Sequence, residues 1–168
     1  MTTANPLRIS VSDLLRRPGA SRAVDVAGPV SDLGNGVAEV PASEAVQFIG
    51  TLERISEGIV ARGIVHATWG GLCSRCLQPL TGDLEIHVDE LFETDPLEGE
   101  TYALDSDQLD LQPLVRDTVA LELPAVPLCA DDCAGLCPNC GADRNSTDCG
   151  CEIDDSDPRW AALRSLDL

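Results

Sequence analysis

Eight cysteines are the residues of this sequence whose chemistry is easiest to recognise. Six lie in LCADDCAGLCPNCGADRNSTDCGC, residues 128–151, and the other two lie far upstream in GLCSRC. A thiol can bind metal, form a disulfide or exchange electrons, and the cellular compartment decides between these uses. The start MTTANPLRIS carries no apolar run typical of a secretory signal, and no stretch approaches a membrane-spanning length. We therefore expect a cytoplasmic protein, without membrane contact, whose reduced cysteines bind metal.

The last four cysteines have the spacing of zinc ligands. In CPNCG, two thiolates separated by two residues can clasp one ion from a tight turn, and Gly141 permits the positive φ that such turns require. In CGC, Gly150 allows both flanking sulfurs to face one point. Four soft ligands this close together predict a tetrahedral zinc site. Its ligands would be Cys137, Cys140, Cys149 and Cys151.

The remaining four cysteines predict a second site of the same kind. CSRC is another clasp, and in CADDC the two sulfurs are four residues apart, so one helical turn would place them on the same face. This site would join the sheet to the segment after the main helix, and it brings the expected cofactor to two zinc ions. Its ligands would be Cys73, Cys76, Cys129 and Cys133.

Several alternatives remain open at this point. An iron–sulfur cluster also takes four cysteines. Cys73 and Cys76 could instead share an ion with Cys137 and Cys140. CSRC could be the dithiol of an oxidoreductase, although such motifs normally precede a helix, and the module could be a zinc reservoir or redox sensor. Disulfides are disfavoured by the expected compartment.

We find no motif that argues for catalysis. The sequence has no glycine-rich phosphate cradle, no GxSxG and no HExxH, and His66 and His87 lie in strand-like segments without ligand spacing. Four thiolates around each ion would leave no open position for a substrate. We expect no enzyme and no small-molecule substrate.

Hydrophobic patterns predict the elements that position the cysteines. QFIGTLERI, SEG and IVARGIVHATW form an expected antiparallel hairpin, and DLEIHVDEL alternates as a half-buried strand, with CSRC in the turn between. LRISV and AVDVAG are weaker strand candidates, and residues 94–107 are expected to be an acidic loop. The main helix is expected at about 110–123, with Asp110 as N-cap, Pro113 in its first turn and Pro124 beyond its end. Its core-facing side would comprise Leu111, Leu114, Val115, Thr118 and Leu121.

The expected class is α+β: an antiparallel β-meander or partly closed sheet, one main helix and a C-terminal zinc-knuckle module. The body would cover residues 1–128, the cysteine-rich zinc module 129–151, and an acidic tail 152–168. In the tail, DPRWAALRSL predicts a short helix, with Pro158 at its first position. Trp160 and Leu163 would share one side of it and pack on the body or on a partner.

Charge is distributed unevenly along the chain. The net formal charge is −18, yet the N-terminal arm (residues 1–24) carries four arginines against the single Asp13. From Asp83 to Asp110 there are carboxylates and no lysine or arginine. An acidic surface repels phosphate backbones and suits a basic protein partner, besides favouring solubility. RNA contact is therefore expected at most through the arm, by Arg8, Arg16, Arg17 and Arg22.

Taken together, these motifs resemble the YceD family, the large ribosomal RNA subunit accumulation proteins of bacteria and plastids. The resemblance rests on CSRCLQPL, DLQPLVRDTVALELPAVPLC, CADDCAGLCPNCGADRN with CGC, and DPRWAAL, in this order over most of residues 72–163. Arg144 departs from the family's usual leucine, which puts the packing beneath the knuckle in question. The resemblance implies a non-catalytic factor in ribosome biogenesis that supports accumulation of the large-subunit ribosomal RNA. Its expected partner is a basic ribosomal protein or a large-subunit assembly intermediate.

Overall fold

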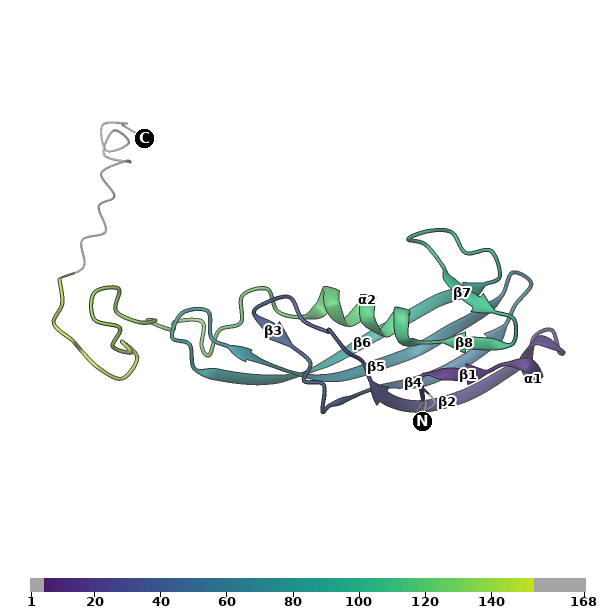
Figure 1. The fold of residues 1–168 in the computed structure, drawn as a ribbon, viewed down its shortest axis with the longest axis horizontal. Coiled ribbons are helices and arrows are strands. Elements are labelled where there is room, and N and C mark those ends of the chain that lie inside the picture. The colour runs from purple at the N-terminus through teal and green to yellow at the C-terminus, as the bar shows by residue number, and fades with distance from the viewer. Residues whose placement is uncertain (1–4, 153–168) are drawn as a thin grey trace, which may run out of the picture.

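Residues 5–152 are described by the computed structural model, and within them a long, curled sheet carries the other elements (Figure 1). Along the sheet the strands follow the order β1-β8-β7-β6-β5-β4-β2, and the short β3 pairs with β5 beside them. The elements in chain order are β1 (Arg8–Ser10), α1 (Ser12–Leu15), β2 (Ser21–Pro29), β3 (Ala38–Glu39), β4 (Ala45–Arg54), β5 (Ile59–Leu72), β6 (Pro79–Glu93), β7 (Tyr102–Asp105), β8 (Gln108–Asp110) and α2 (Gln112–Glu122).

The predicted hairpin and the predicted half-buried strand are both confirmed. β4 and β5 pair antiparallel from Gln47↔His66 to Arg54↔Ile59, and β5 and β6 pair antiparallel from Ile59↔Phe92 to Leu72↔Pro79. On β6, Val88 is buried, Leu84 and Ile86 are half-buried, and the residues between them are exposed. The two weaker candidates near the N-terminus are also strands, β1 and β2. The β5–β6 hairpin projects beyond the rest of the sheet, and its turn contains the CSRC motif (Figure 1).

The sheet curls into a half-barrel. Gly50 and Gly63 are paired on β4 and β5, where a Cβ on Gly50 would collide with the carbonyl oxygen of Arg62. Paired glycines permit this close backbone approach and the bend that goes with it. The curl brings the two outermost strands together, because the guanidinium of Arg22 on β2 donates to the carbonyl of Ser10 on β1 at 2.8 Å.

The predictions for residues 94–107 and for an antiparallel meander are correct only in part. The segment contains β7, which pairs in parallel with the end of β6, at Phe92↔Tyr102, and antiparallel with β8. The rings of Phe92 and Tyr102 stack with centroids 5.2 Å apart, and this contact with the end of β6 stabilises the strand. The acidic, turn-rich composition of the segment hides a strand of four residues from pattern analysis.

The main helix is found close to its predicted place, with one error in its buried face. α2 begins at Gln112 with Leu111 as its N-cap, so the predicted N-cap Asp110 is wrong by one residue; Asp110 ends β8, and its carboxylate accepts from Gln112 N–H at 2.9 Å. Val119 is buried, whereas Leu121, which was predicted to face the core, is 85% exposed. The helix packs on β5 and β6, and the core lies between α2 and the concave side of the sheet. Among the described residues, no helix has the length and apolar character needed to cross a membrane. The predicted helix with Trp160 and Leu163 lies outside the described residues.

Candidate metal centres

The eight cysteine sulfurs gather into two groups of four, and every sulfur lies within 4.8 Å of the others in its group. We call the first group the hairpin site and the second the distal site. All eight are free thiols. The partition matches the one predicted from spacing. The hairpin site contains Cys73, Cys76, Cys129 and Cys133, and the distal site contains Cys137, Cys140, Cys149 and Cys151.

The sulfur spacing fits a single tetrahedral ion. In the hairpin site, the Sγ atoms of Cys73 and Cys133 are 3.8 Å apart, and those of Cys76 and Cys129 are 3.6 Å apart. A zinc ion with four Zn–S bonds of about 2.3 Å places its sulfurs about 3.8 Å from one another. The eight thiols therefore offer two donor sets with the composition and spacing of structural metal sites.

The two CxxC clasps are built by the same backbone hydrogen bonds. In the distal site, Gly141 N–H donates to Cys137 C=O and Cys137 N–H donates to Ala142 C=O, both at 2.8 Å. In the hairpin site, the same bonds run from Leu77 to Cys73 at 2.9 Å and from Cys73 to Gln78 at 2.8 Å. The residue after the second cysteine has positive φ in each clasp, 75° for Gly141 and 61° for Leu77.

The hairpin site is integrated into the body of the protein. Cys73 is fully buried, and Cys76 and Cys133 are nearly so, with Leu80, Leu128 and Leu136 packed against them. Ser74 N–H donates to the carbonyl of Pro127 at 2.8 Å, which ties the hairpin turn to the segment after α2. The CADDC segment forms a turn rather than the expected helical turn, with Cys133 N–H donating to Ala130 C=O.

Two residues that sequence reasoning missed support the hairpin site. The guanidinium of Arg75, inside CSRC, donates to the carbonyls of Asp131 and Cys133 at 3.1 and 3.0 Å. The Asn145 amide donates to Cys133 Sγ at 3.3 Å and accepts from Ala134 N–H at 2.7 Å. Asn145 belongs to the loop between the two halves of the distal site, so it connects the two groups. Arg144, which departs from the family pattern, is exposed. Asn145 is one of several polar residues in the cysteine-rich loop, and the sequence alone gives no sign that it contacts Cys133.

Each group contains one thiol poised to ionise and one that holds its proton. Backbone N–H groups of Cys76, Arg75 and Cys129 lower the pKa of Cys73 to about 6, against the opposing effect of burial. The N–H groups of Cys140 and Asn139 do the same for Cys137. The thiols of Cys129 and Cys151 donate hydrogen bonds to neighbouring cysteine sulfurs, which favours their protonated forms and raises their pKa values to about 12. Four thiols this close cannot all ionise without a cation, so a metal ion would displace protons when it binds.

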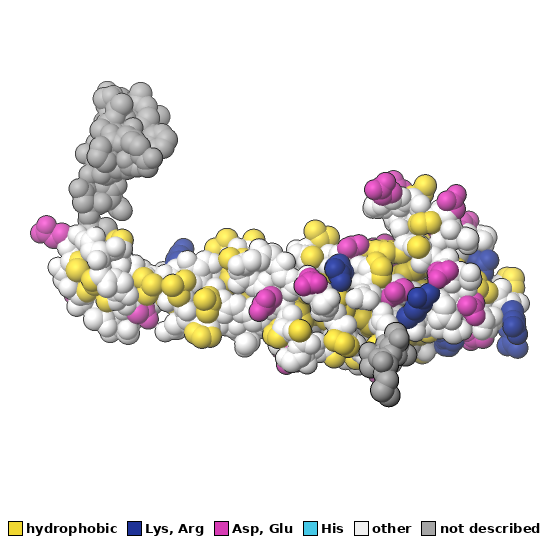
Figure 2. Space-filling model, viewed as in Figure 1, with side chains coloured by type: hydrophobic (Ala, Val, Ile, Leu, Met, Phe, Trp, Pro, Cys, Tyr) yellow, Lys and Arg dark blue, Asp and Glu magenta, His cyan; other side chains and the backbone are white. Residues whose placement is uncertain are grey.

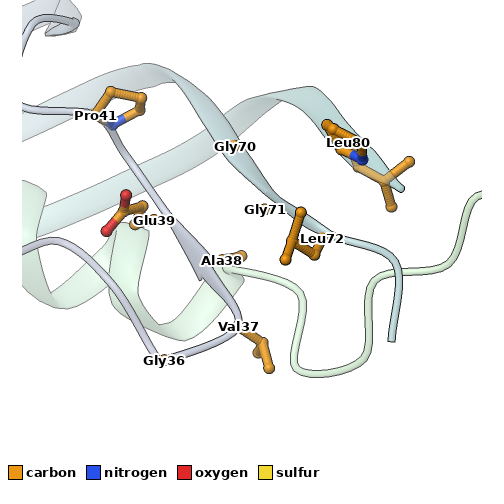
Figure 3. A pocket seen from close by; sticks show the side chains of 10 residues that line it. Gly36, Val37, Ala38, Glu39, Pro41, Gly70, Gly71, Leu72 and Leu80 are labelled. Carbon is orange, nitrogen blue, oxygen red and sulfur yellow. The ribbon is translucent and has the colours of Figure 1, made fainter. Parts of the chain in front are cut away.

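A shallow apolar groove lies next to the hairpin site. It has a volume of about 580 Å³ and runs between β3 and the end of the β5–β6 hairpin (Figure 3). Val37 and Leu72 on its rim are 43% and 50% exposed. Gly71, at the base of the groove, pairs with Ala38 of β3, and a Cβ there would lie only 2.6 Å from the carbonyl oxygen of Val37. The end of the hairpin thus combines thiol ligands with exposed apolar surface.

The four candidate arginines of the N-terminal arm are part of the folded body. Arg8 pairs with Asp105 at 2.7 Å, and Arg22 pairs with Asp13 at 2.8 Å. Arg16 and Arg17 are exposed directly after α1, at the end of the molecule opposite the cysteine-rich segment (Figure 1). Acidic side chains gather over α2, β7 and β8 (Figure 2). Two of the four arginines are therefore engaged by carboxylates, and the other two face solvent.

Comparisons with known proteins place the chain in a family. The family described as large ribosomal RNA subunit accumulation protein YceD matches residues 61–167. An uncharacterized protein of Mycobacterium tuberculosis is 34% identical over 95% of this chain and 81% of its own length. The chloroplastic YCED homolog 1 of Arabidopsis thaliana is 32% identical over 35% of this chain and 18% of its own length. YlbN of Bacillus subtilis is 31% identical over 56% of this chain and 58% of its own length. No solved structure matches. The match of the family over both cysteine groups and α2 shows that the chain belongs to the YceD family.

Proposed function

We propose that this protein is a non-catalytic, zinc-binding factor in ribosome biogenesis that supports accumulation and assembly of the large-subunit ribosomal RNA. The observation that carries the proposal is the pair of compact four-thiol groups within the segment that matches the YceD family. The link to large-subunit RNA comes from the family, whose members are described as large ribosomal RNA subunit accumulation proteins. The zinc ions would hold the cysteine-rich segment against the β5–β6 hairpin, so that both present one contact surface.

Zinc is the metal that the donor sets favour. Four thiolates suit zinc or an iron–sulfur cluster. A cluster distributes its cysteines over several irons, which sets their sulfurs farther apart than four ligands of one ion. All four sulfurs of each group lie within 4.8 Å of one another, which favours a single ion. A dithiol oxidoreductase would need an accessible attacking thiol, but Cys73 is fully buried.

A basic protein partner fits the charge of the chain. The net charge of −18 disfavours broad contact with RNA, and it would attract a basic ribosomal protein or a particle that carries one. The exposed pair Arg16 and Arg17 offers the best place for a limited RNA contact. We expect the protein to act in the cytoplasm, where the large subunit is assembled.

Two measurements test this proposal. Elemental analysis of the purified full-length chain should find two zinc ions and no iron. Density-gradient sedimentation of the tagged protein from growing cells should place it with immature large-subunit RNA at physiological salt. Confinement of the protein to the top of the gradient, with no basic ribosomal protein bound to it, would contradict the proposed role.

A further inference from the structure

β6 has a long edge that is not paired within residues 5–152. The strand runs from Pro79 to Glu93 and pairs with β5 from Pro79 to Phe92. On its other side it pairs with β7 only at Phe92 and Glu93. An unpaired edge presents a row of backbone donors and acceptors, and proteins use such rows to bind an extended segment as an additional strand.

The register identifies the free backbone groups. Cys73 N–H donates to Gln78 C=O, and the pairing continues without a bulge to Ile59↔Phe92. Antiparallel pairs alternate between hydrogen-bonded and non-hydrogen-bonded, so every second residue of β6 turns its N–H and C=O away from β5. In the described part of the chain, these groups have no backbone partner. They belong to Thr81, Asp83, Glu85, His87 and Asp89.

The side chains along this edge select the charge of the added strand. Those of Thr81, Asp83, Glu85, His87 and Asp89 are all exposed on the outer face. Asp89 is paired with Arg62 at 2.9 Å and Asp83 accepts from Thr68, so Glu85 carries the least engaged carboxylate. A strand laid along this edge would place alternate side chains next to these carboxylates, where basic residues are favoured and acidic ones are repelled.

A second acidic feature, a cavity, lies near the end of β6 that pairs with β7. A cavity of about 310 Å³ between α2, β6 and β7 is lined by the carboxylates of Glu90, Glu100 and Asp117. It is also lined by Tyr102, whose hydroxyl donates to Asp117 at 3.2 Å. Among the described residues, no basic side chain lines this cavity. Its size and charge suit one lysine or arginine side chain of a bound segment.

Like charge disfavours the simplest alternative, which is pairing of two copies of this chain. Joining two β6 edges antiparallel about their centre would place Glu85 opposite Glu85 of the other copy. Like charges directly opposite one another destabilise a strand pair. Acidic side chains of this kind protect a free edge from self-association, and the same carboxylates favour a basic strand.

From this edge and its charge, we infer that β6 binds an extended segment of a basic protein as an added strand, with one cationic side chain in the Glu90–Glu100–Asp117 cavity. The inference rests on the proposed function in one respect, namely that the partner is basic, and it adds where and how that partner binds. Backbone hydrogen bonds would supply affinity, and the carboxylates would supply selection.

A synthetic peptide tests the inference on the zinc-loaded, full-length chain. The probe is a nine-residue peptide of alternating arginine and valine, and its control has every backbone amide N-methylated, so that neither of its edges can donate hydrogen bonds. The charge of the two peptides is identical, but the control cannot pair with a strand edge. We expect the probe alone to bind and to slow amide hydrogen exchange at residues 81, 83, 85, 87 and 89. Equal binding of both peptides would overturn the inference, because it would show attraction by charge alone.

Matched variants locate the contact on β6. Glu85→Arg should weaken probe binding by at least about fivefold. Glu44→Arg changes the charge equally, before β4 on the other side of β5, and should have little effect. His87→Pro removes an edge N–H that β5 does not use, so the fold should persist, as circular dichroism would check, while probe binding falls. Unchanged binding by both edge variants would also overturn the inference.

The outcomes separate this inference from the proposed function. Peptide binding at β6 without sedimentation on large-subunit precursors would retain the edge site and contradict the ribosomal role. Sedimentation that persists in Glu85→Arg and His87→Pro, together with no peptide binding, would retain the role and contradict the edge site.

Discussion

Replacing Cys76 by serine should cost the protein one zinc ion and destabilise the whole domain. Replacing Cys140 should cost the other ion and leave the melting temperature of the domain nearly unchanged. The difference follows from burial and connectivity. Cys76 is 5% exposed and its sulfur lies 3.6 Å from that of Cys129, 53 positions along the chain, so this site joins the β5–β6 hairpin to the segment after α2. Cys140 is exposed, and its group is drawn from one short segment.

The expected change in melting temperature follows from the thermodynamic linkage between zinc binding and folding. An ion that binds only the folded state, at about 1,000 times its Kd, stabilises that state by about 4 kcal/mol. In a domain of this size each kcal/mol changes Tm by about 2–4 °C, so loss of the hairpin ion should lower Tm by roughly 8–16 °C. Thermal melts in a zinc buffer would measure this, with the metal content of each variant measured by mass spectrometry. The wild-type Tm should rise with free zinc, and that of Cys76→Ser should not.

Two results would refute this reasoning. If Cys140→Ser lowered Tm as much as Cys76→Ser, the distal site would be part of the cooperative core. If Cys76→Ser retained two ions, Cys76 would not be a ligand and the partition of thiols would be wrong. Retention of one ion by Cys76→Ser, together with loss of that last ion in the double variant Cys76→Ser/Cys140→Ser, would support the partition.

Three further predictions concern the metal sites. Asn145→Ala, which removes the hydrogen bond to Cys133 Sγ, should weaken zinc binding at the hairpin site by about 10–100-fold in chelator competition; unchanged affinity would show that the contact is incidental. Gly141→Ala should destabilise the distal clasp by about 1–2 kcal/mol, because the residue has a φ of 75° that alanine adopts only with strain. No atom lies within 4 Å of the new Cβ, so the strain is the whole cost. Zinc affinity at that site should therefore fall about fivefold to thirtyfold in the same assay. Zinc affinity should increase with pH, because the ion must displace protons from thiols such as Cys129, whose pKa is about 12. Below pH 6 the affinity should fall more steeply with decreasing pH, because Cys73, whose pKa is about 6, then also has to lose a proton. Competition titrations from pH 5.5 to 7.5 would check this, and an affinity independent of pH would contradict it.

Local pattern was sufficient to predict much of the fold. The alternation of DLEIHVDEL, the Ser-Glu-Gly turn and the apolar spacing of α2 all depend on neighbours in sequence, and the structure contains the corresponding strand, hairpin and helix. Where the pattern failed, a distant contact decided the outcome. β7 exists because Tyr102 reaches Phe92, and Val119 is buried in place of Leu121 because the sheet sets which side of α2 is covered.

For the cysteine sites, too, the sequence determined some features and the tertiary structure determined others. Residue type and CxxC spacing by themselves determined that this chain carries clasps suited to a soft metal. The total of eight cysteines suggested two sets of four ligands. Only the tertiary structure brought Cys73 and Cys76 to within 4.8 Å of Cys129 and Cys133, because α2 crosses the sheet and returns the chain to the end of the β5–β6 hairpin. It also placed Leu77 at φ 61°, in the same left-handed region as Gly141 of the other clasp, and within residues 5–152 it left most of the outer edge of β6 unpaired. Register, curl and helix placement arise from contacts between residues far apart in sequence, and a local pattern contains no record of them.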